Sequence, residues 1–281
     1  MRISDTHNDF LTKLNDTEYF TYLNECEKQG VENLLCSIFT SELKKDSIIQ
    51  KIENDSCLIL AYGKSGYKIH IEDLGFLNSS KEIEKLLSIA PFSCSLTWNN
   101  DNQFAGGNFG FKTISKNGKK LISLLEESKV IVDVAHLNRK SFGKFISINN
   151  KPIFCSHTGL CMSKKSPRNL TDSQIKEIIS TGGYYGLFLS STYMTNKGRL
   201  SSKSFANIIY KTFCKFGDNN VGLGSDFYGI SPNPTDISNY TGFKKVVNEL
   251  ERLGVQKVSI DKFFYKNFAD FKSAQKIPPL S

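Results

Sequence analysis

Several signatures of common enzyme classes are missing from this 281-residue chain. No G-x-G-x-x-G, P-loop or G-x-S-x-G motif stands at the end of an expected strand, which argues against dinucleotide, nucleoside-triphosphate and serine-hydrolase sites. No apolar run reaches the ~18 to 20 residues that a membrane-spanning helix needs. The opening stretch, Met1-Arg2-Ile3-Ser4-Asp5, turns acidic where a signal peptide would turn apolar. We therefore expect a cytoplasmic protein without a membrane anchor.

Cysteine pairs and dense runs of one charge are also absent. An odd number of scattered cysteines without a C-x-x-C pair excludes a disulfide framework and a cysteine zinc site. We expect reduced, mostly buried thiols at Cys26, Cys36, Cys57, Cys94, Cys155, Cys161 and Cys214. The formal net charge of +8 comes from lysines spread along the chain in short pairs such as Lys44-Lys45. Such pairs are typical of a solvated surface, so the charge predicts no nucleic-acid partner.

What the chain does contain is a regular alternation of short apolar runs with amphipathic stretches of helical spacing. The apolar runs predict eight strands: Arg2–His7, Leu34–Thr40, Tyr67–Glu72, Phe92–Trp98, Val130–His136, Pro152–His157, Tyr184–Ser190 and Val221–Asp226. Helices are expected between them, for example over Ser80–Ile89 and over Thr171–Ser180, where Thr171 to Gln174 form a capping-box start. Cys57–Tyr62 fits either a helix end or an extra strand.

Eight strand-then-helix units in ~250 to 300 residues favour an α/β fold of the (β/α)8 TIM-barrel type. We expect a single domain over residues 1–281, with Gly242–Leu253 and Ser259–Ala274 as closing helices and Lys276–Ser281 as a short tail. A doubly wound open sheet is the competing architecture, but it usually has fewer strands and often a Gly-rich first turn.

Side chains able to bind a metal stand at the ends of these strands, where a barrel builds its active site. The residues at these ends are His7, Asp9, Glu72, His136, His157 and Asp226. His7 and Asp9 are two apart and share a face of the strand, so one ion could contact both. Histidines with carboxylates suit Zn²⁺, and Mn²⁺ or Co²⁺ less well, and six ligands fit two metals that share a carboxylate.

Each of these residues taken alone has a plainer interpretation. A lone histidine is most often a buried residue with a hydrogen-bond partner, and a lone glutamate such as Glu72 is most often on the surface. His70 lies two residues before Glu72 and could share its face, but we place it outside the metal-binding set. The case for a site rests on the set of strand ends, not on any member.

The same residues belong to stretches that resemble the motifs of a known family. These are Ser4-Asp5-Thr6-His7-Asn8-Asp9, Ile71-Glu72-Asp73, Ser95-Leu96-Thr97-Trp98-Asn99, Val132-Asp133-Val134-Ala135-His136, Phe154-Cys155-Ser156-His157-Thr158, Pro167-Arg168-Asn169 and Gly222-Leu223-Gly224-Ser225-Asp226-Phe227. In this order along nearly the whole chain, they are similar to the membrane (renal) dipeptidase family of metallopeptidases.

The resemblance implies a dipeptidase with two zinc ions and an attacking hydroxide that bridges them. His7 and Asp9 would bind the first ion, His136 and His157 the second, and Glu72 would bridge both. Arg168 matches the arginine that grips the substrate carboxylate, a task that suits its guanidinium fork. Asp226 matches the acid that takes a proton from the water and passes it to the leaving amine.

Two positions depart from the family pattern. Trp98 stands where animal members have a histidine that helps to polarise the scissile carbonyl; we expect Trp98 to form an apolar wall of the substrate pocket, with Asn99 or Asn102 supplying a replacement hydrogen bond. Tyr228 replaces a second carboxylate after the last strand. The predicted substrate is a small peptide. The sequence leaves open whether the chain forms a homodimer. The alternatives are a related amide hydrolase dedicated to one small peptide product and an inactive barrel used as a binding scaffold.

Overall fold

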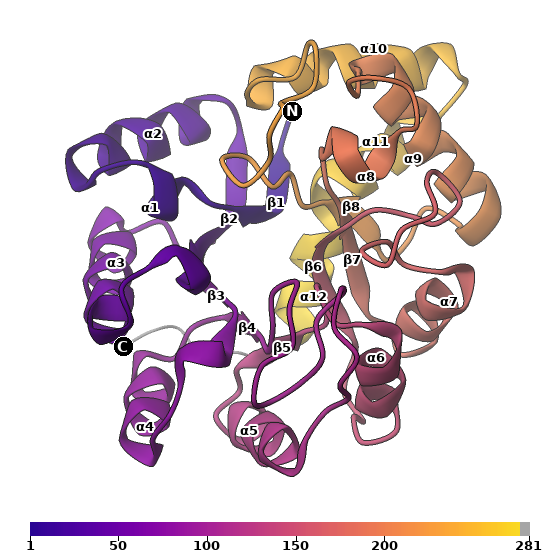
Figure 1. Ribbon diagram of the computed structural model, residues 1–281. Coiled ribbons are helices and arrows are strands. Elements are labelled where there is room, and N and C mark those ends of the chain that lie inside the picture. Colours follow the sequence, from indigo (N-terminus) through magenta and orange to yellow (C-terminus); the bar gives the residue numbers. More distant parts are fainter. Residues whose placement is uncertain (276–281) are drawn as a thin grey trace.

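The computed structural model describes residues 1–275, and they form a closed eight-stranded parallel barrel with strands in chain order. Viewed down its axis, the barrel is a ring of strands enclosed by helices (Figure 1). The strands are β1 (Ile3–Asn8), β2 (Val31–Phe39), β3 (Tyr67–Glu72), β4 (Ser93–Ser95), β5 (Ile131–Asp133), β6 (Phe154–Thr158), β7 (Tyr184–Leu187) and β8 (Val221–Leu223). The predicted (β/α)8 fold is confirmed, and the expected tail Lys276–Ser281 lies outside the described residues.

The helices cover the outside of the ring and one of its ends. They are α1 (Phe10–Lys13), α2 (Asp16–Lys28), α3 (Ile48–Tyr62), α4 (Ser80–Ile89), α5 (Lys116–Glu127), α6 (Arg139–Ile146), α7 (Asp172–Ser180), α8 (Ser191–Met194), α9 (Ser202–Phe216), α10 (Phe243–Arg252), α11 (Lys257–Asp261) and α12 (Asn267–Ala274). A π-helical segment, η5 (Lys262–Lys266), joins the last two. The predicted capping box is present, since Thr171 Oγ1 accepts from Gln174 N. Cys57–Tyr62 is the end of helix α3, not a strand.

Several strands are shorter at their C-terminal ends than the apolar runs predict. Strands β5 and β8 end before His136 and Asp226, whose φ angles are 65° and 61°. These left-handed conformations are incompatible with a continuing strand. Two buried carboxylates also accept hydrogen bonds from backbone N–H groups near the ends of these strands. Asp133 Oδ1 accepts from Ala135 N at 2.9 Å, and Asp5 Oδ1 accepts from Ser225 N at 2.7 Å. His136, Asp226 and Trp98 therefore lie on loops just beyond the strands.

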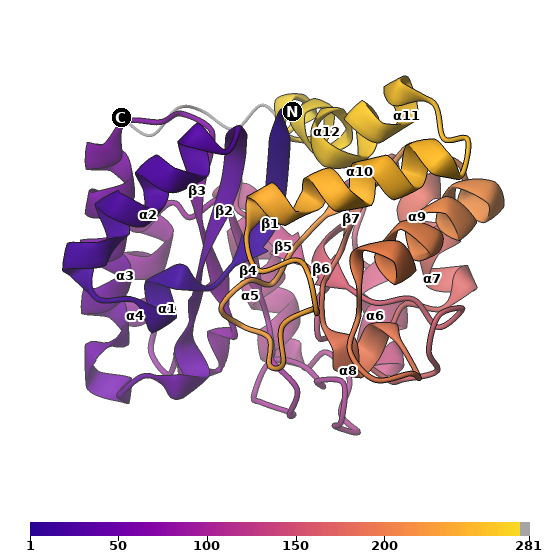
Figure 2. The same ribbon diagram turned by 90° about the horizontal axis from the view of Figure 1, so that it is seen from above.

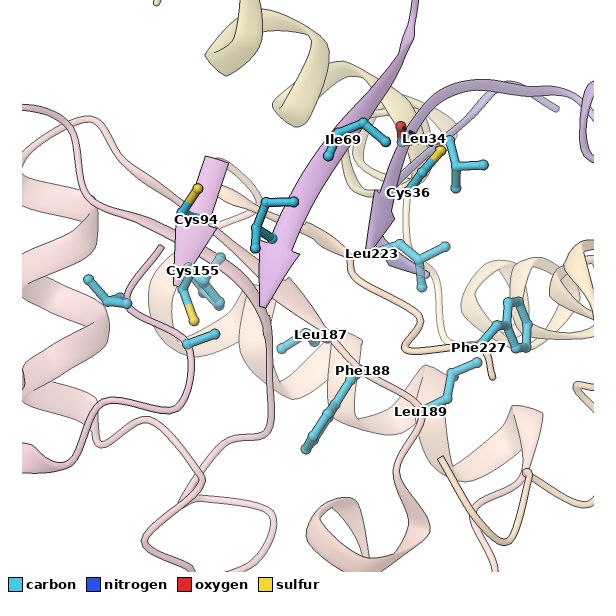
Figure 3. Close-up of a cluster of buried hydrophobic side chains, with 14 of the residues drawn as sticks. Leu34, Cys36, Ile69, Cys94, Cys155, Leu187, Phe188, Leu189, Leu223 and Phe227 are labelled. Atoms are coloured by element: carbon cyan, nitrogen blue, oxygen red, sulfur yellow. Dashed lines mark hydrogen bonds between the residues drawn. The ribbon is translucent and has the colours of Figure 1, made fainter. Parts of the chain in front are cut away.

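Apolar side chains fill the barrel and pack the helices onto it. Figure 3 shows part of this core, including Leu34, Ile69, Leu187 and Leu223 from four different strands. Four of the seven cysteines are buried, Cys161 is half-buried and Cys57 and Cys214 are exposed, so most of the thiols are shielded from solvent, as expected.

Helix α12 lies across the end of the barrel at which β1 begins, and the loops after the strands project from the opposite end (Figure 2). Phe268 and Phe271 of α12 form a second apolar cluster with Phe154, Tyr184, Phe92 and Leu35. Burial of several aromatic rings closes this end to water. At the other end, the C-terminal mouth of the barrel, a pocket is lined by residues that follow the strands.

Candidate metal centre and active site

The residues predicted to bind metal converge at this mouth around one carboxylate, Glu72. Its Oε1 lies 2.9 Å from His136 Nε2 and 3.7 Å from His157 Nε2. Its other oxygen, Oε2, lies 3.6 Å from His7 Nε2, which is in turn 3.3 Å from Asp9 Oδ2. Strands β1, β3 and β6, together with the residue that follows β1 and the loop after β5, thus bring together all five predicted ligands. Glu72 lies between two groups of them, with one oxygen toward each.

The buried polar atoms of this cluster lack protein partners that would satisfy them. His7 Nε2, Asp9 Oδ1 and Glu72 Oε1 have no hydrogen bond among the described residues, and all three side chains are less than a tenth exposed. Buried polar groups are normally paired, because an unpaired one costs roughly 1 to 3 kcal/mol. The ligand atoms of His7, Glu72 and His157, and those of His7, Asp9 and Asp226, lie within 4.8 Å of one another. The donor set and its unpaired atoms fit metal ions.

The charges of the cluster are strongly coupled. Burial would raise the pKa of Glu72, but His136 and His7 hold it well below its usual range. Burial, reinforced by Arg168, lowers the pKa of His136 to about 4, and burial lowers that of His157 well below its usual range. His136 and His157 are therefore neutral at pH 7, the form in which imidazole binds a metal. Burial would also lower the pKa of His7, but the Asp9 and Glu72 carboxylates raise it well above its usual range.

Hydrogen bonds at the far side of each ring orient the two neutral histidines. His157 Nδ1 lies 2.8 Å from Ser156 Oγ, and this hydroxyl donates to Asp133 Oδ2. His136 Nδ1 lies 2.9 Å from Asn99 Oδ1. Such outer partners fix the tautomer and direct Nε2 at a metal. Neither Asp133 nor Ser156 was predicted to have a role; the available signal was an aspartate inside an otherwise apolar run.

Asp226 lies beside Asp9, on the His7 side of the cluster. Burial and the nearby Asp9 carboxylate raise the pKa of Asp226 well above its usual range. Gly229 makes room for both groups, since a Cβ at that position would meet Asp226 Oδ1 at 2.2 Å and Asp9 Oδ2 at 2.3 Å. An acid of raised pKa at the wall of a pocket is suited to accept and return a proton.

Arg168 follows β6 and is only 4% exposed, so it is not a surface residue. Its Nη2 donates to the carbonyl of His157 at 3.0 Å, and its guanidinium carbon lies 5.1 Å from the centre of the Phe188 ring. These contacts hold the guanidinium at the wall of the pocket that also contains Glu72, His136 and Asp226. An arginine held in this way can bind a carboxylate through two parallel hydrogen bonds.

Trp98 lines the same pocket, with its ring centre 5.0 Å from that of Phe39 and 6.2 Å from that of His136. Asn99 also lines the pocket. Asn102 does not reach it: its amide nitrogen donates to Asp73 Oδ1 and to the carbonyl of Leu96. Of the two asparagines considered as replacement hydrogen-bond donors, Asn99 is the one that lines the pocket.

Four further side chains lie at or near the mouth. Lys13 Nζ and Glu42 Oε2 form an ion pair of 2.6 Å at the rim of the pocket, and no motif in the sequence indicated it. His70 is fully buried with Nδ1 2.8 Å from Ser93 Oγ, and it is absent from the groups of residues whose ligand atoms converge. Tyr228, at the position of the missing carboxylate, is 38% exposed and contacts Tyr22.

A parallel barrel with a buried cluster of histidines and carboxylates at its C-terminal mouth defines a metal-dependent hydrolase. Comparison of the sequence with known families makes this more specific, because residues 61–275 match the membrane dipeptidase family (peptidase family M19). The chain belongs to this family of metallopeptidases, as its motifs predicted. The family implies metal ions and peptide substrates.

Curated relatives share a quarter or so of their residues with this chain. An uncharacterised protein of the pqqA 5′ region of Klebsiella pneumoniae is 27% identical over 71% of this chain and 78% of its own length. An uncharacterised dipeptidase of Schizosaccharomyces pombe is 24% identical over 80% of this chain and 56% of its own. Dipeptidase ataJ of Aspergillus terreus is 29% identical over 47% of this chain and 33% of its own length. The chain thus spans half or less of some curated dipeptidases.

Solved structures agree in fold over almost the full chain. The metallopeptidase described as dipeptidase AC has a TM-score of 0.86 at 18% identity, covering 97% of this chain and 98% of its own. A metallopeptidase of Rhodobacter sphaeroides, solved with a phosphinate mimic of the dipeptide L-Ala-D-Ala, has a TM-score of 0.81 at 18% identity, covering 97% and 99%. Within residues 1–275, no helix has the length and apolar character needed to cross a membrane.

Proposed function

We propose that this chain is a dipeptidase that hydrolyses the peptide bond of a dipeptide with the help of two metal ions, with Zn²⁺ as the expected metal. The observation that carries the proposal is the arrangement around Glu72, whose two oxygens face separate groups of buried ligands. His7 and Asp9 would hold one ion, and His136 and His157 the other. Bound there, the ions would activate a water molecule and stabilise the charge that develops on the carbonyl oxygen.

The protein side chains would place the substrate and move the proton. Arg168 would hold the terminal carboxylate and so fix the peptide bond over the cluster. Asp226, on the side of Asp9, would accept a proton from the attacking water and return it to the leaving amine. Glu72 would contribute by holding the two metal positions together.

A comparison of dipeptides with their C-terminal amides tests the substrate class. The amide lacks the anion that Arg168 would bind, so its kcat/KM should be lower by roughly 30- to 700-fold, or about 2 to 4 kcal/mol. Arg168→Ala should abolish most of this difference by impairing the acid far more than the amide. Arg139→Ala is the matched control, because Arg139 is an exposed arginine at the start of α6 that donates to Cys161 Sγ and does not line this pocket.

The other outcomes separate the alternatives. Equal cleavage of acid and amide by the wild-type protein would replace the dipeptidase proposal with a more general amide hydrolase. No cleavage of any member of a broad dipeptide panel by metal-loaded protein would favour an inactive scaffold.

A further inference from the structure

The loop after β4 carries an amide donor that the residues around it leave unused. Asn99 lines the pocket beside Glu72 and His136, and its Oδ1 lies 2.9 Å from His136 Nδ1. Asn99 Nδ2 makes no hydrogen bond to any residue in the described part of the chain. A polar group that faces a substrate pocket without a protein partner is available to the substrate.

The orientation of this amide follows from the role of the histidine. His136 Nε2 faces Glu72 Oε1 at 2.9 Å and His157 Nε2 at 3.0 Å, so Nε2 is the atom directed at the metal cluster. The remaining ring nitrogen, Nδ1, then carries the proton and donates to an oxygen. Asn99 must therefore present Oδ1 to His136, which turns its NH₂ group away from the ring.

The loop that holds Asn99 is fixed by its own contacts. Phe109 N donates to the Asn99 carbonyl at 2.9 Å, and Gly107 packs so closely that a Cβ there would meet the Trp98 carbonyl oxygen at 2.4 Å. Asn102 Oδ1 accepts from Phe104 N at 2.8 Å, which caps the next turn. The Asn99 amide is thus held in place before any substrate binds, as a donor to a developing charge should be.

A neighbouring amide does not compete for this role. Asn108 also approaches His136 Nδ1, at 3.4 Å. In the orientation that satisfies its surroundings, Asn108 donates to the carbonyls of Pro167 and Leu137, both at 3.3 Å. Its donors are used by the backbone, whereas those of Asn99 are not.

The position of Asn99, across the barrel from Asp226, suits a hydrogen bond to the carbonyl oxygen of the scissile peptide bond. Asn99 follows β4 and Asp226 follows β8, and these strands lie opposite each other in the ring of eight (Figure 1). If Asp226 serves the leaving amine, a donor on the β4 side faces the carbonyl oxygen of the same peptide bond. Trp98, which stands where animal members of the family have a histidine, lies on the same side of the pocket.

We propose that Asn99 Nδ2 donates a hydrogen bond to the scissile carbonyl oxygen of the bound dipeptide and stabilises the negative charge that develops on it. This inference rests on the proposed dipeptidase function. Asn99 is then a catalytic residue with two tasks, since its Oδ1 orients His136 while its Nδ2 contacts the substrate.

Two substitutions separate these tasks. Asn99→Asp keeps an oxygen for His136 Nδ1 and removes the donor, whereas Asn99→Ala removes both. Loss of one such donor typically lowers kcat by roughly 10² to 10³. Both variants should show this loss with a dipeptide KM within about threefold of wild type, because the bond strengthens only in the transition state. Metal content measured by elemental analysis should stay at the wild-type value in Asn99→Asp.

Binding of a phosphinate dipeptide mimic gives a readout that does not depend on turnover. Calorimetric titration into metal-loaded protein should show affinity reduced in Asn99→Asp and Asn99→Ala by a factor close to the loss in kcat, because the mimic resembles the transition state. Asn100→Asp is the matched control: the next residue is exposed, does not line the pocket, and adds the same charge. It should keep wild-type kcat and affinity.

The result that overturns the inference is Asn99→Asp with wild-type kcat and wild-type affinity for the mimic while Asn99→Ala is impaired, since Asn99 would then act only through His136. Equal impairment in Asn100→Asp would also overturn it by assigning the effect to charge. Failure of the wild-type protein to cleave dipeptides is a separate result, which contradicts the proposed function instead.

Discussion

The two ends of the barrel differ in the kind of side chain that they bury. At the end covered by α12, aromatic rings such as Phe154, Phe268 and Phe271 pack against one another in an apolar cluster. At the mouth, the buried side chains of His7, Asp9 and Glu72 retain polar atoms that make no hydrogen bond to the described residues. Aromatic packing stabilises the folded chain by itself, whereas the mouth is incomplete without something that the protein does not supply. The contrast separates the residues that fold the chain from those that act.

The largest effect on activity should come from the mouth. Asp226→Asn removes the proposed proton acceptor with little change of shape, so kcat should fall by a factor on the order of 10² to 10⁴ while both metals remain bound. Steady-state kinetics with elemental analysis checks this. Asp270→Asn on α12, where the side chain is exposed and pairs with Lys266, should change neither quantity. Loss of a metal from Asp226→Asn would make Asp226 a ligand, since it lies within reach of His7 and Asp9.

At the closed end, an effect of similar size should appear in stability alone. Phe268→Ala removes a ring that is 1% exposed and packs against Phe154 and Tyr184. The free energy of unfolding of the metal-free protein should fall by about 3 to 5 kcal/mol, with kcat per folded molecule unchanged. Urea denaturation measures the first quantity. Phe111→Ala, at a ring that is 84% exposed, should change it by less than about 0.5 kcal/mol. A large drop in the kcat of folded Phe268→Ala would show that the two ends are coupled.

A smaller effect should come from the residues behind the ligands. Ser156→Ala removes the hydroxyl that links His157 Nδ1 to Asp133 Oδ2. Metal affinity should fall by roughly 10- to 100-fold, as is usual when an outer partner of a ligand is lost. Competition with a chelator of known affinity measures it, and Ser128→Ala at the exposed end of α5 is the control. Wild-type affinity in Ser156→Ala would leave the orientation of His157 to other contacts.

The smallest effect should be confined to the pocket wall. Trp98→Ala opens the side of the pocket near Phe39, so KM should rise, by up to tenfold or so, for dipeptides with bulky side chains and change little for the smallest. A panel of dipeptides graded by side-chain size checks this. An equal fall in kcat for every member of the panel would give the Trp98 position a role in stabilising charge.

The sequence predicted the fold and family better than it predicted the details of the site. Apolar runs and helical spacing were sufficient for the eight strands, because a buried parallel barrel needs continuous apolar segments. They placed His136 and Asp226 on strands, however, since nothing local shows that both residues adopt left-handed conformations. The apolar run containing Asp133 looked like any buried strand, although its carboxylate accepts two backbone hydrogen bonds and supports Ser156.

The proposed metal ligands were accessible to sequence reasoning because each stands at or just after a strand end. The pairing of Asn99 with His136 was not, because it joins two loops 37 residues apart and depends on how each ring and amide is turned. The exposed ion pair of Lys13 and Glu42 also could not be predicted from the sequence, because it joins two segments that are distant along the chain.

Metal titration of chelator-stripped protein, followed by elemental analysis and dipeptide hydrolysis at each step, tests whether the cluster around Glu72 is a two-metal hydrolytic centre. Activity should be absent without metal, the protein should bind two equivalents per chain, and hydrolysis should be restored as the sites fill. Binding of no more than one equivalent with full activity, or full activity in the stripped protein, would contradict a two-metal centre.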